Sequence, residues 1–337
     1  MSQSLDSSNH YRQGKFHNST PKEAPSFSKM MEIFKRYIVE ERIDSRPAKA
    51  LPIKLVSRAQ LDALSNRELH VIKLGHSSIL LKIYGEYWLI DPVFSERASP
   101  FSFIGPKRFQ STPISIAELP TIKSVLISHN HYDHLDKTSI QQLADKTEQF
   151  LVPLGNQKDM QKWGVAKAQI KSFDWWQEYK VGETVVAFTP SQHFSGRSMS
   201  DRNRTLWGSW VIKTAKQSLF FSGDSGYFKG FKEIGEKYGP FDLTMIEVGA
   251  YNKDWPKVHM MPEQSVQAHI DLRGETMLAI HNSTFDLAFH SWYEPLERAA
   301  LSAQRRKVNL ITPIVGEVFT STQNTTTNQW WKTQSRQ

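Results

Sequence analysis

A segment dense in metal-binding side chains is the feature that most limits how this chain can fold. The apolar run Val125-Leu126-Ile127-Ser128 is typical of a buried strand, and residues 129–134 then read His-Asn-His-Tyr-Asp-His. Imidazole and carboxylate groups bind borderline divalent ions such as zinc, and the chain has no cysteine to build a structural thiolate site. The sequence therefore predicts a catalytic metal site where a strand ends.

The spacing inside this segment indicates two ions. Side chains two residues apart in an extended or turning backbone point to the same side, so His129 and His131 can share one ion while Asp133 and His134 face another. A single histidine is more often a capping or core residue. Four ligands among six residues after a strand favour metal binding instead.

Composition and charge limit the class of protein and its partners. Of the 337 residues, 39% are hydrophobic and 12% aromatic, which is the content of a folded globular chain. A formal charge of +8 favours anionic partners, namely phosphates, nucleic acid or an acidic lipid surface, without choosing among them. Because the chain has no cysteine, no apolar run of about 18 residues and no signal-peptide core at its start, we expect a cytoplasmic protein, either soluble or peripheral on the inner membrane face.

Polar ends flank a continuous body. Residues 1–25 and 319–337 are polar and lack apolar periodicity, apart from Trp330-Trp331, and are expected to be flexible tails. Residues 26–68 are expected to form an N-terminal helical segment, in which apolar residues at 27, 30, 31, 34, 38 and 39 recur at helical spacing. This amphipathic helix either packs on the body or lies at a membrane surface, and the sequence leaves both open. No internal linker divides residues 50–318, and residues 69–318 are the expected catalytic domain.

Short strands and helices alternate through that domain. Runs at 70–73, 79–83 and 87–90 predict the start of an antiparallel sheet. Further strands are expected at 124–128, 149–153, 184–190, 208–213, 217–222, 243–248, 276–280 and 308–312, and helices near 137–145, 155–163, 229–238, 262–272 and 293–304. The alternation falls into two similar halves, which predicts an α/β fold of two sheets packed face to face with helices outside.

Three further ligands are expected where other apolar strands end, since such sites are assembled from several strand ends. His193 follows the strand 185–189, Asp224 follows 219–222 and His281 follows 277–280. Each one alone is more often a cap, a turn residue or a hydrogen-bonded core histidine. Their recurrence at equivalent places favours one shared site.

This pattern resembles the metallo-β-lactamase superfamily, through residues 128–136, Gly223-Asp224, His193 and His281. Within it, the chain is similar to the family of N-acylphosphatidylethanolamine-hydrolysing phospholipase D and its bacterial relatives. The likeness covers roughly residues 70–290 and extends to further segments, namely Asp91-Pro92-Val93-Phe94-Ser95, Gly105-Pro106-Lys107-Arg108-Phe109, Asp174-Trp175-Trp176, Thr189-Pro190-Ser191-Gln192-His193, Gly239-Pro240-Phe241-Asp242-Leu243 and Gly249-Ala250-Tyr251. The resemblance implies an αββα four-layer sandwich with two zinc ions.

The resemblance also assigns roles to individual residues. One zinc ion would be bound by His129, His131 and His193 and the other by Asp133, His134 and His281, with Asp224 bridging them and a hydroxide between the ions attacking phosphorus. Asp133, Asp224 and His259 would be the catalytic residues, with His259 contacting the phosphate or protonating the leaving oxygen. Arg197 and Lys253, together with His259, are the expected substrate contacts. The alternatives are that His259 is a surface or helix-start histidine and that Arg197 and Lys253 are solvated basic residues.

Three places depart from the family pattern. Asn282-Ser283 follows His281 where relatives usually have Trp-Gly, Phe194 stands where they commonly have Trp, and Glu247 stands where proline is expected. All seven ligands are retained. The changes therefore bear on the head group that is recognised more than on the metal chemistry.

The expected function is that of a zinc-dependent phosphodiesterase of phospholipase D type, which cuts N-acylphosphatidylethanolamine to N-acylethanolamine and phosphatidic acid. Its partners would be a phospholipid substrate and an anionic membrane surface, and a homodimer stays open. One alternative is a metal-dependent hydrolase of a small soluble ester, lactone or phosphodiester. Another is a membrane-associated binding protein with a silent site, which the retention of seven ligands disfavours. Nucleic acid is not an expected partner, because the chain has no basic-aromatic repeat and no inserted clamping domain.

Overall fold

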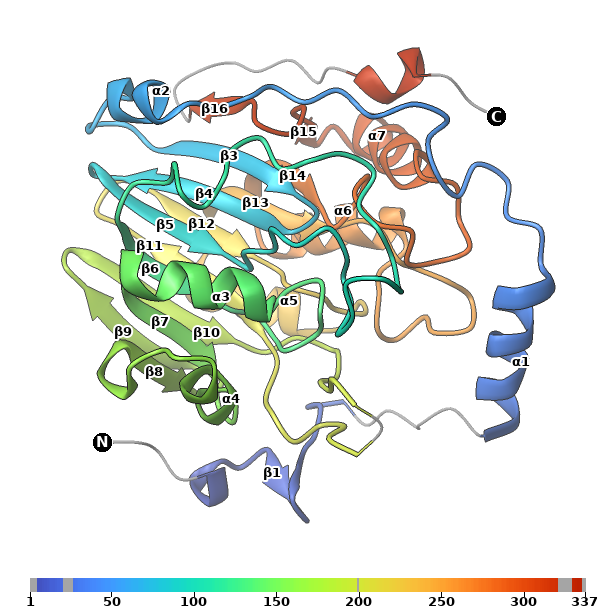
Figure 1. Ribbon diagram of the computed structural model, residues 1–337, viewed down its shortest axis with the longest axis horizontal. Helices are drawn as coiled ribbons and strands as arrows, with labels where there is room; N and C mark the ends of the chain where they lie inside the picture. Colours follow the sequence, from blue (N-terminus) through green and yellow to red (C-terminus); the bar gives the residue numbers. More distant parts are fainter. Residues whose placement is uncertain (1–4, 21–26, 199, 321–328, 335–337) are drawn as a thin grey trace.

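Two seven-stranded sheets form the body of the protein (Figure 1). The computed structural model describes residues 5–20, 27–198, 200–320 and 329–334. The first sheet has the order β16-β3-β4-β5-β6-β7-β8, with bounds Val318–Thr320, His70–Gly75, Ser78–Ile83, Glu86–Ile90, Ile122–Leu126, Thr147–Pro153 and Ile170–Phe173. Its strands are antiparallel from β16 to β5 and parallel from β5 to β8.

The second sheet repeats this arrangement. Its order is β15-β14-β13-β12-β11-β10-β9, with bounds Asn309–Ile311, Gly274–Ile280, Phe241–Glu247, Ser218–Phe221, Ser209–Lys213, Thr184–Thr189 and Gln177–Val181. Strands β9 to β12 are antiparallel and strands β12 to β15 are parallel. The two similar halves expected from the sequence are therefore confirmed, and the strands not expected in them are β8, β9 and β16.

Alternating side chains of each strand enter different layers, which is why most strands are apolar on both faces. In the first sheet, Leu81 and Trp88 face the core between the sheets, whereas Leu80 and Leu89 face the outer helices. Those helices are α2 (Arg58–Ala63), α3 (Lys137–Leu143) and α4 (Gln157–Lys162). Helices α5 (Gly230–Tyr238), α6 (Pro262–Asp271) and α7 (Glu294–Arg306) cover the second sheet. The result is the expected αββα sandwich.

The N-terminal region departs from the expected flexible tail. Residues Leu5–Ser7 form a 3-10 turn (η1), and β1 (Tyr11–Arg12) pairs with β2 (Lys15–Phe16). Phe16 is fully buried in the core between the sheets. The Asn18 amide donates to the His193 carbonyl (2.8 Å) and accepts from the His193 amide (3.1 Å). This segment packs because one aromatic residue and one amide find partners far away in the sequence, which no local periodicity reveals.

The C-terminal region also differs from the expected tail in the part that the structure describes. Trp330 and Trp331, in the 3-10 turn η4 (Trp330–Thr333), are buried beside α7 and the second sheet. The Trp330 indole N–H donates to the Thr312 carbonyl at 3.1 Å. The other 3-10 turns among the described residues are η2 (Ala144–Lys146) and η3 (Lys167–Gln169).

Helix α1 (Phe27–Val39) occupies the expected amphipathic segment. Lys29 and Arg36 both form ion pairs with Asp254, and Arg36 stacks over Phe289, so the helix is held against the body through its basic residues. Of the apolar positions expected to form its stripe, residues 31 and 39 are exposed, and the side chains at 27, 30, 34 and 38 lie outside the described residues. Among the described helices, none has the length and apolarity needed to cross a lipid bilayer.

Candidate metal centre

The seven ligands predicted from the sequence come together where strands of both sheets end. The segment 129–134 follows β6, His193 follows β10, Asp224 follows β12 and His281 follows β14. After β6 the chain turns tightly, with the amides of His134 and Leu135 both donating to the His131 carbonyl. Asp136 then caps helix α3 by accepting from the Thr138 amide. This compact turn presents several side chains of the segment toward one point.

The first donor group consists of His129, His131, His193 and Asp224, whose ligand atoms all lie within 4.8 Å of one another. His131 Nδ1 lies 2.9 Å from His129 Nε2 and 3.2 Å from His193 Nε2. Asp224 Oδ2 lies 3.6 Å from the His129 nitrogen and 3.7 Å from the His193 nitrogen. Ligand atoms sharing one tetrahedral zinc ion are about 3.3 Å apart, so this group matches such an ion.

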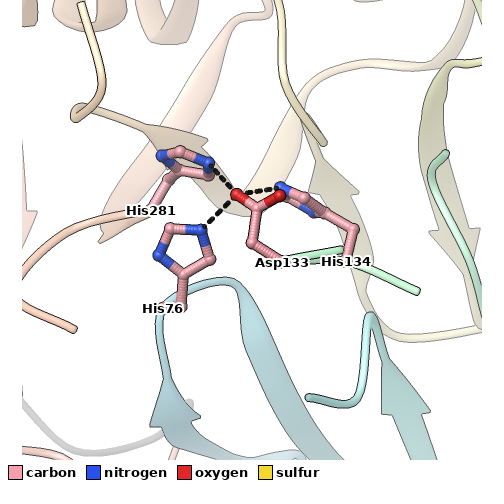
Figure 2. Close-up of side chains that lie close together, drawn as sticks. All are labelled: His76, Asp133, His134 and His281. Atoms are coloured by element: carbon pink, nitrogen blue, oxygen red, sulfur yellow. Dashed lines mark hydrogen bonds and ion pairs between the residues drawn. The ribbon is translucent and has the colours of Figure 1, made fainter. Parts of the chain in front are cut away.

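The second donor group consists of His76, Asp133, His134 and His281 (Figure 2). Asp133 Oδ2 lies 3.0 Å from His76 Nε2, 3.3 Å from His281 Nε2 and 3.5 Å from His134 Nε2. The other oxygen of Asp224, Oδ1, is 3.1 Å from His134 Nε2 and 3.2 Å from His281 Nε2. Asp224 thus points one oxygen at each group, which is the geometry of a bridging carboxylate.

Orphaned polar atoms show that these residues fit bound cations. His134 Nε2, His281 Nε2 and Asp224 Oδ1 are buried, and although the oxygen lies 3.1 Å and 3.2 Å from the two nitrogens, none of the three makes a hydrogen bond of normal geometry with the described residues. Leaving buried polar atoms without a partner is costly, and native proteins rarely do it. A cation shared by these three atoms would satisfy all of them.

The electrostatics of the site lead to the same conclusion. Burial lowers the pKa of His129 and His193 well below the ordinary value and that of His131 to about 4, so these imidazoles are neutral, as metal binding requires. At His281, burial opposes the charged form, but Asp224 and Asp133 outweigh it and raise the pKa to about 10. The proton on His281 therefore supplies positive charge that the carboxylates need and that a metal ion would replace.

Outer hydrogen bonds orient the imidazoles. Asp91 follows β5, is fully buried and accepts from the Ser128 amide (2.7 Å), the Ser128 hydroxyl (2.5 Å) and His134 Nδ1 (2.7 Å). His193 Nδ1 donates to the Val258 carbonyl at 2.8 Å. With Nδ1 protonated, Nε2 of His134 and of His193 keeps its lone pair for a metal ion.

His76 and Glu247 were not predicted as site residues. His76 directly follows β3, and Glu247 is the last residue of β13, so the strand-end rule that located the other ligands applies to both. Glu247 joins a third cluster with Asp224, His259 and His281. Its Oε2 lies 2.8 Å from His259 Nδ1, while His259 Nε2 faces Asp224 Oδ2 at 3.9 Å. The predicted catalytic residue His259 therefore lies at the site.

The two predicted basic contacts, Arg197 and Lys253, have neighbours in the protein itself. Arg197 Nη1 donates to the carbonyls of Asn130 (2.8 Å) and Leu135 (2.6 Å), and its guanidinium stacks over Tyr132 at 4.0 Å. Its guanidinium thus braces the backbone of the 129–134 segment, a role that was not expected from the sequence. Lys253 lies near α1, where it lowers the pKa of Asp254 after the larger effects of Lys29 and Arg36.

Arg108 is a basic residue beside the second donor group that was not predicted. Its guanidinium lies against Gly75, next to His76, and over the Phe285 ring at 5.7 Å, a ring that His76 also contacts. Its Nε and Nη1 atoms are buried and have no hydrogen-bond partner among the described residues. Burial lowers the Arg108 pKa to about 10, which still leaves the group charged at neutral pH.

Comparisons with known proteins agree with this geometry. The sequence profile of the beta-lactamase superfamily domain matches residues 87–282. An uncharacterised Mycobacterium tuberculosis protein is 41% identical over 97% of this chain and 88% of its own length. The N-acyl-phosphatidylethanolamine-hydrolyzing phospholipase D 1 of Caenorhabditis elegans is 32% identical over 73% of this chain and 74% of its own.

A solved structure shares the fold. The metallo hydrolase Igni18 from Ignicoccus hospitalis superposes with a TM-score of 0.58 at 20% identity, over 75% of this chain and 97% of its own. The matched profile spans β5 to β14 and so contains every predicted ligand. This chain belongs to the metallo-β-lactamase superfamily and is one of its metal-dependent hydrolases.

Proposed function

We propose that the protein is a two-zinc phosphodiesterase of phospholipase D type that hydrolyses N-acylphosphatidylethanolamine to phosphatidic acid and N-acylethanolamine. The observation that carries the proposal is Asp224, which offers one oxygen to each of two complete donor groups. Such paired sites suit in-line displacement at phosphorus. The name of the Caenorhabditis elegans relative supports the choice of phospholipid among phosphodiesters.

In this proposal, each residue of the site has a role in binding metal, transferring a proton or binding substrate. His129, His131 and His193 would hold one zinc ion, and Asp133, His134 and His281 the other, with His76 beside the second ion. When bound, the two ions would acidify a water molecule and neutralise charge developing on the phosphoryl oxygens. His259 is the residue that can hold a proton near the leaving oxygen, because its Nε2 faces the Asp224 edge of both groups. Arg108 replaces Arg197 as the proposed contact for an anionic group of the substrate.

An exposed apolar loop supports a membrane as the source of substrate. Residues 96–108, here called the finger, form a hairpin closed by the Arg108 amide on the Glu96 carbonyl (2.9 Å) and the Ala98 amide on the Pro106 carbonyl (3.0 Å). The Arg97 guanidinium stiffens the tip by donating to the carbonyls of Ser102 and Gly105. The finger is therefore a hairpin held together by its own hydrogen bonds.

The tip of the finger carries Phe101, Phe103 and Ile104, which are 54%, 77% and 58% exposed. Its base is attached beside the second donor group, where the Phe109 amide donates to the Thr284 carbonyl, three residues after His281. Exposed aromatic and aliphatic side chains next to basic residues are the composition of interfacial anchors. The finger would thus dip into an anionic bilayer and hold the metal centre near the head groups.

Hydrolysis in labelled water tests the proposal. The purified, zinc-loaded protein is incubated with N-acylphosphatidylethanolamine vesicles in H₂¹⁸O, and the products are analysed by mass spectrometry. The expected result is one ¹⁸O atom in phosphatidic acid, none in N-acylethanolamine, and no product after chelation. Absence of phosphatidic acid, or its formation regardless of chelator, contradicts the proposal. Turnover of small esters or lactones alone would favour the second reading, a hydrolase of soluble substrates.

A further inference from the structure

Glu247 is a fully buried carboxylate that clusters with Asp224, His259 and His281 at the metal centre. It ends β13, and its amide donates to the Ser222 hydroxyl. A buried carboxylate is costly unless it is hydrogen-bonded. The contacts of its two oxygen atoms therefore indicate what it does.

The two oxygens of Glu247 have different partners. Oε1 accepts from two backbone amides, Ser225 N–H at 3.2 Å and Met260 N–H at 3.1 Å. Oε2 contacts a side chain, His259 Nδ1, at 2.8 Å. Ser225 follows Asp224 and Met260 follows His259, so one carboxylate ties together the two loops that carry these site residues.

This arrangement fixes the state of the His259 ring. Burial raises the pKa of Glu247, but the two backbone N–H groups that donate to Oε1 favour its ionised form. An ionised carboxylate only accepts hydrogen bonds, so the proton of a neutral His259 lies on Nδ1 and its Nε2 carries the lone pair. The ring lies between ligands of both donor groups, with centroids 5.2 Å from those of His193 and His281. The side chain of His259 is 13% exposed, whereas that of Asp224 is 2% exposed, so His259 is the member of the pair that a substrate can reach.

We propose that Glu247 is a positioning residue that holds His259 in the Nδ1–H tautomer and aims its Nε2 at the reacting groups. The tautomer of the His259 ring does not depend on which substrate the enzyme hydrolyses. Only its consequence for turnover rests on the proposed function, in which Nε2 takes the proton of the hydroxyl group that adds to phosphorus and passes it to the leaving oxygen.

The substitution Glu247→Gln reverses the tautomer without changing the shape of the side chain. The amide NH₂ of glutamine cannot sit at the Oε1 position, because it would face two backbone N–H donors. Its carbonyl oxygen therefore stays there and its NH₂ turns to His259 Nδ1. The ring must then accept at Nδ1 and carry its proton on Nε2, which removes the lone pair from the side that faces the site.

The primary test is NMR of the zinc-loaded protein labelled with ¹⁵N-histidine, near pH 8, with His259 assigned by its absence in His259→Ala. Two-bond ¹H–¹⁵N couplings tell which ring nitrogen carries the proton. We expect Nδ1–H in the wild type and Nε2–H in Glu247→Gln. An Nε2–H ring in the wild type, or the same tautomer in both proteins, overturns the proposal. The wild-type spectrum decides alone if the variant does not fold.

A double-mutant cycle on any substrate that the enzyme turns over is the second test. Glu247→Gln should lower kcat by about 10²-fold or more with little change in KM, the size of loss expected when a general acid or base is disabled. In a His259→Ala background, Glu247→Gln should lower kcat no further. Two additive losses would overturn a role exerted through His259. Because the NMR test needs no substrate, the tautomer result stands or falls separately from the proposed lipid hydrolysis.

Discussion

Removing the apolar tip of the finger should weaken membrane binding by a predictable amount. Fully burying a side chain such as Phe or Ile contributes about 1.5–3 kcal/mol. Phe101, Phe103 and Ile104 are 54%, 77% and 58% exposed, so inserting all three would contribute about 3–6 kcal/mol. The triple serine variant should therefore partition onto vesicles about 10²- to 10⁴-fold more weakly.

Sedimentation with vesicles containing phosphatidylglycerol measures this partitioning. Leu301→Ser is the matched control, since Leu301 is an exposed apolar residue (48%) on helix α7, which covers the second sheet. Because the chain has no cysteine, Phe103→Cys and Leu301→Cys can also be labelled singly with an environment-sensitive dye. Only the dye at position 103 should respond to vesicles. Unchanged partitioning of the triple variant, or an equal loss in Leu301→Ser, would refute the reasoning.

Further predictions concern the metal centre and its supports. Asp91→Asn should lower zinc affinity about 10- to 100-fold at the second donor group, because Asp91 orients His134, and metal-buffered titration should then show one ion lost before the other. Arg197→Lys should lower the free energy of unfolding by about 1–3 kcal/mol with KM unchanged, since Arg197 braces backbone carbonyls. Arg108→Gln should instead raise KM for an anionic substrate, and equal KM effects in both variants would contradict these assignments. In chelated protein, burial lowers the His281 pKa, but Asp224 and Asp133 raise it to about 10, above the unfolded value of 6.5. The protonated His281 therefore contributes its full stabilisation below about pH 6.5, and this contribution is lost as the pH rises toward 10. The melting temperature of the chelated protein should fall across that window, and a fall of the same size in zinc-loaded protein would count against replacement of that proton by a metal ion.

The layered fold and the convergence of the seven predicted ligand residues were predictable for the same reason. Strands buried on both faces are mostly apolar, so polar residues within three positions of their ends are conspicuous, as at His129, Asp224 and His281. The same rule applies to His76 and Glu247, but a histidine in a tight turn and a glutamate before Val-Gly are also ordinary turn and strand-end residues. Only their contacts across the sheets distinguish them.

Other features depend on partners that no local pattern reveals. Arg197 looks like a solvated or phosphate-binding cation in sequence, and its role becomes clear only when the carbonyls of Asn130 and Leu135 are seen beside it. Phe16 is a single apolar residue in a polar stretch, yet it fills the core between the sheets. In both cases the energy comes from long-range contacts, which periodicity and composition do not encode.

Anomalous diffraction at the zinc edge, from crystals of the zinc-loaded protein, tests the central claim most directly. We predict two peaks per chain on either side of the Asp224 carboxylate, one within bonding distance of His129, His131 and His193 and the other of Asp133, His134 and His281. A single peak, or peaks away from Asp224, would contradict a paired metal centre bridged by this residue.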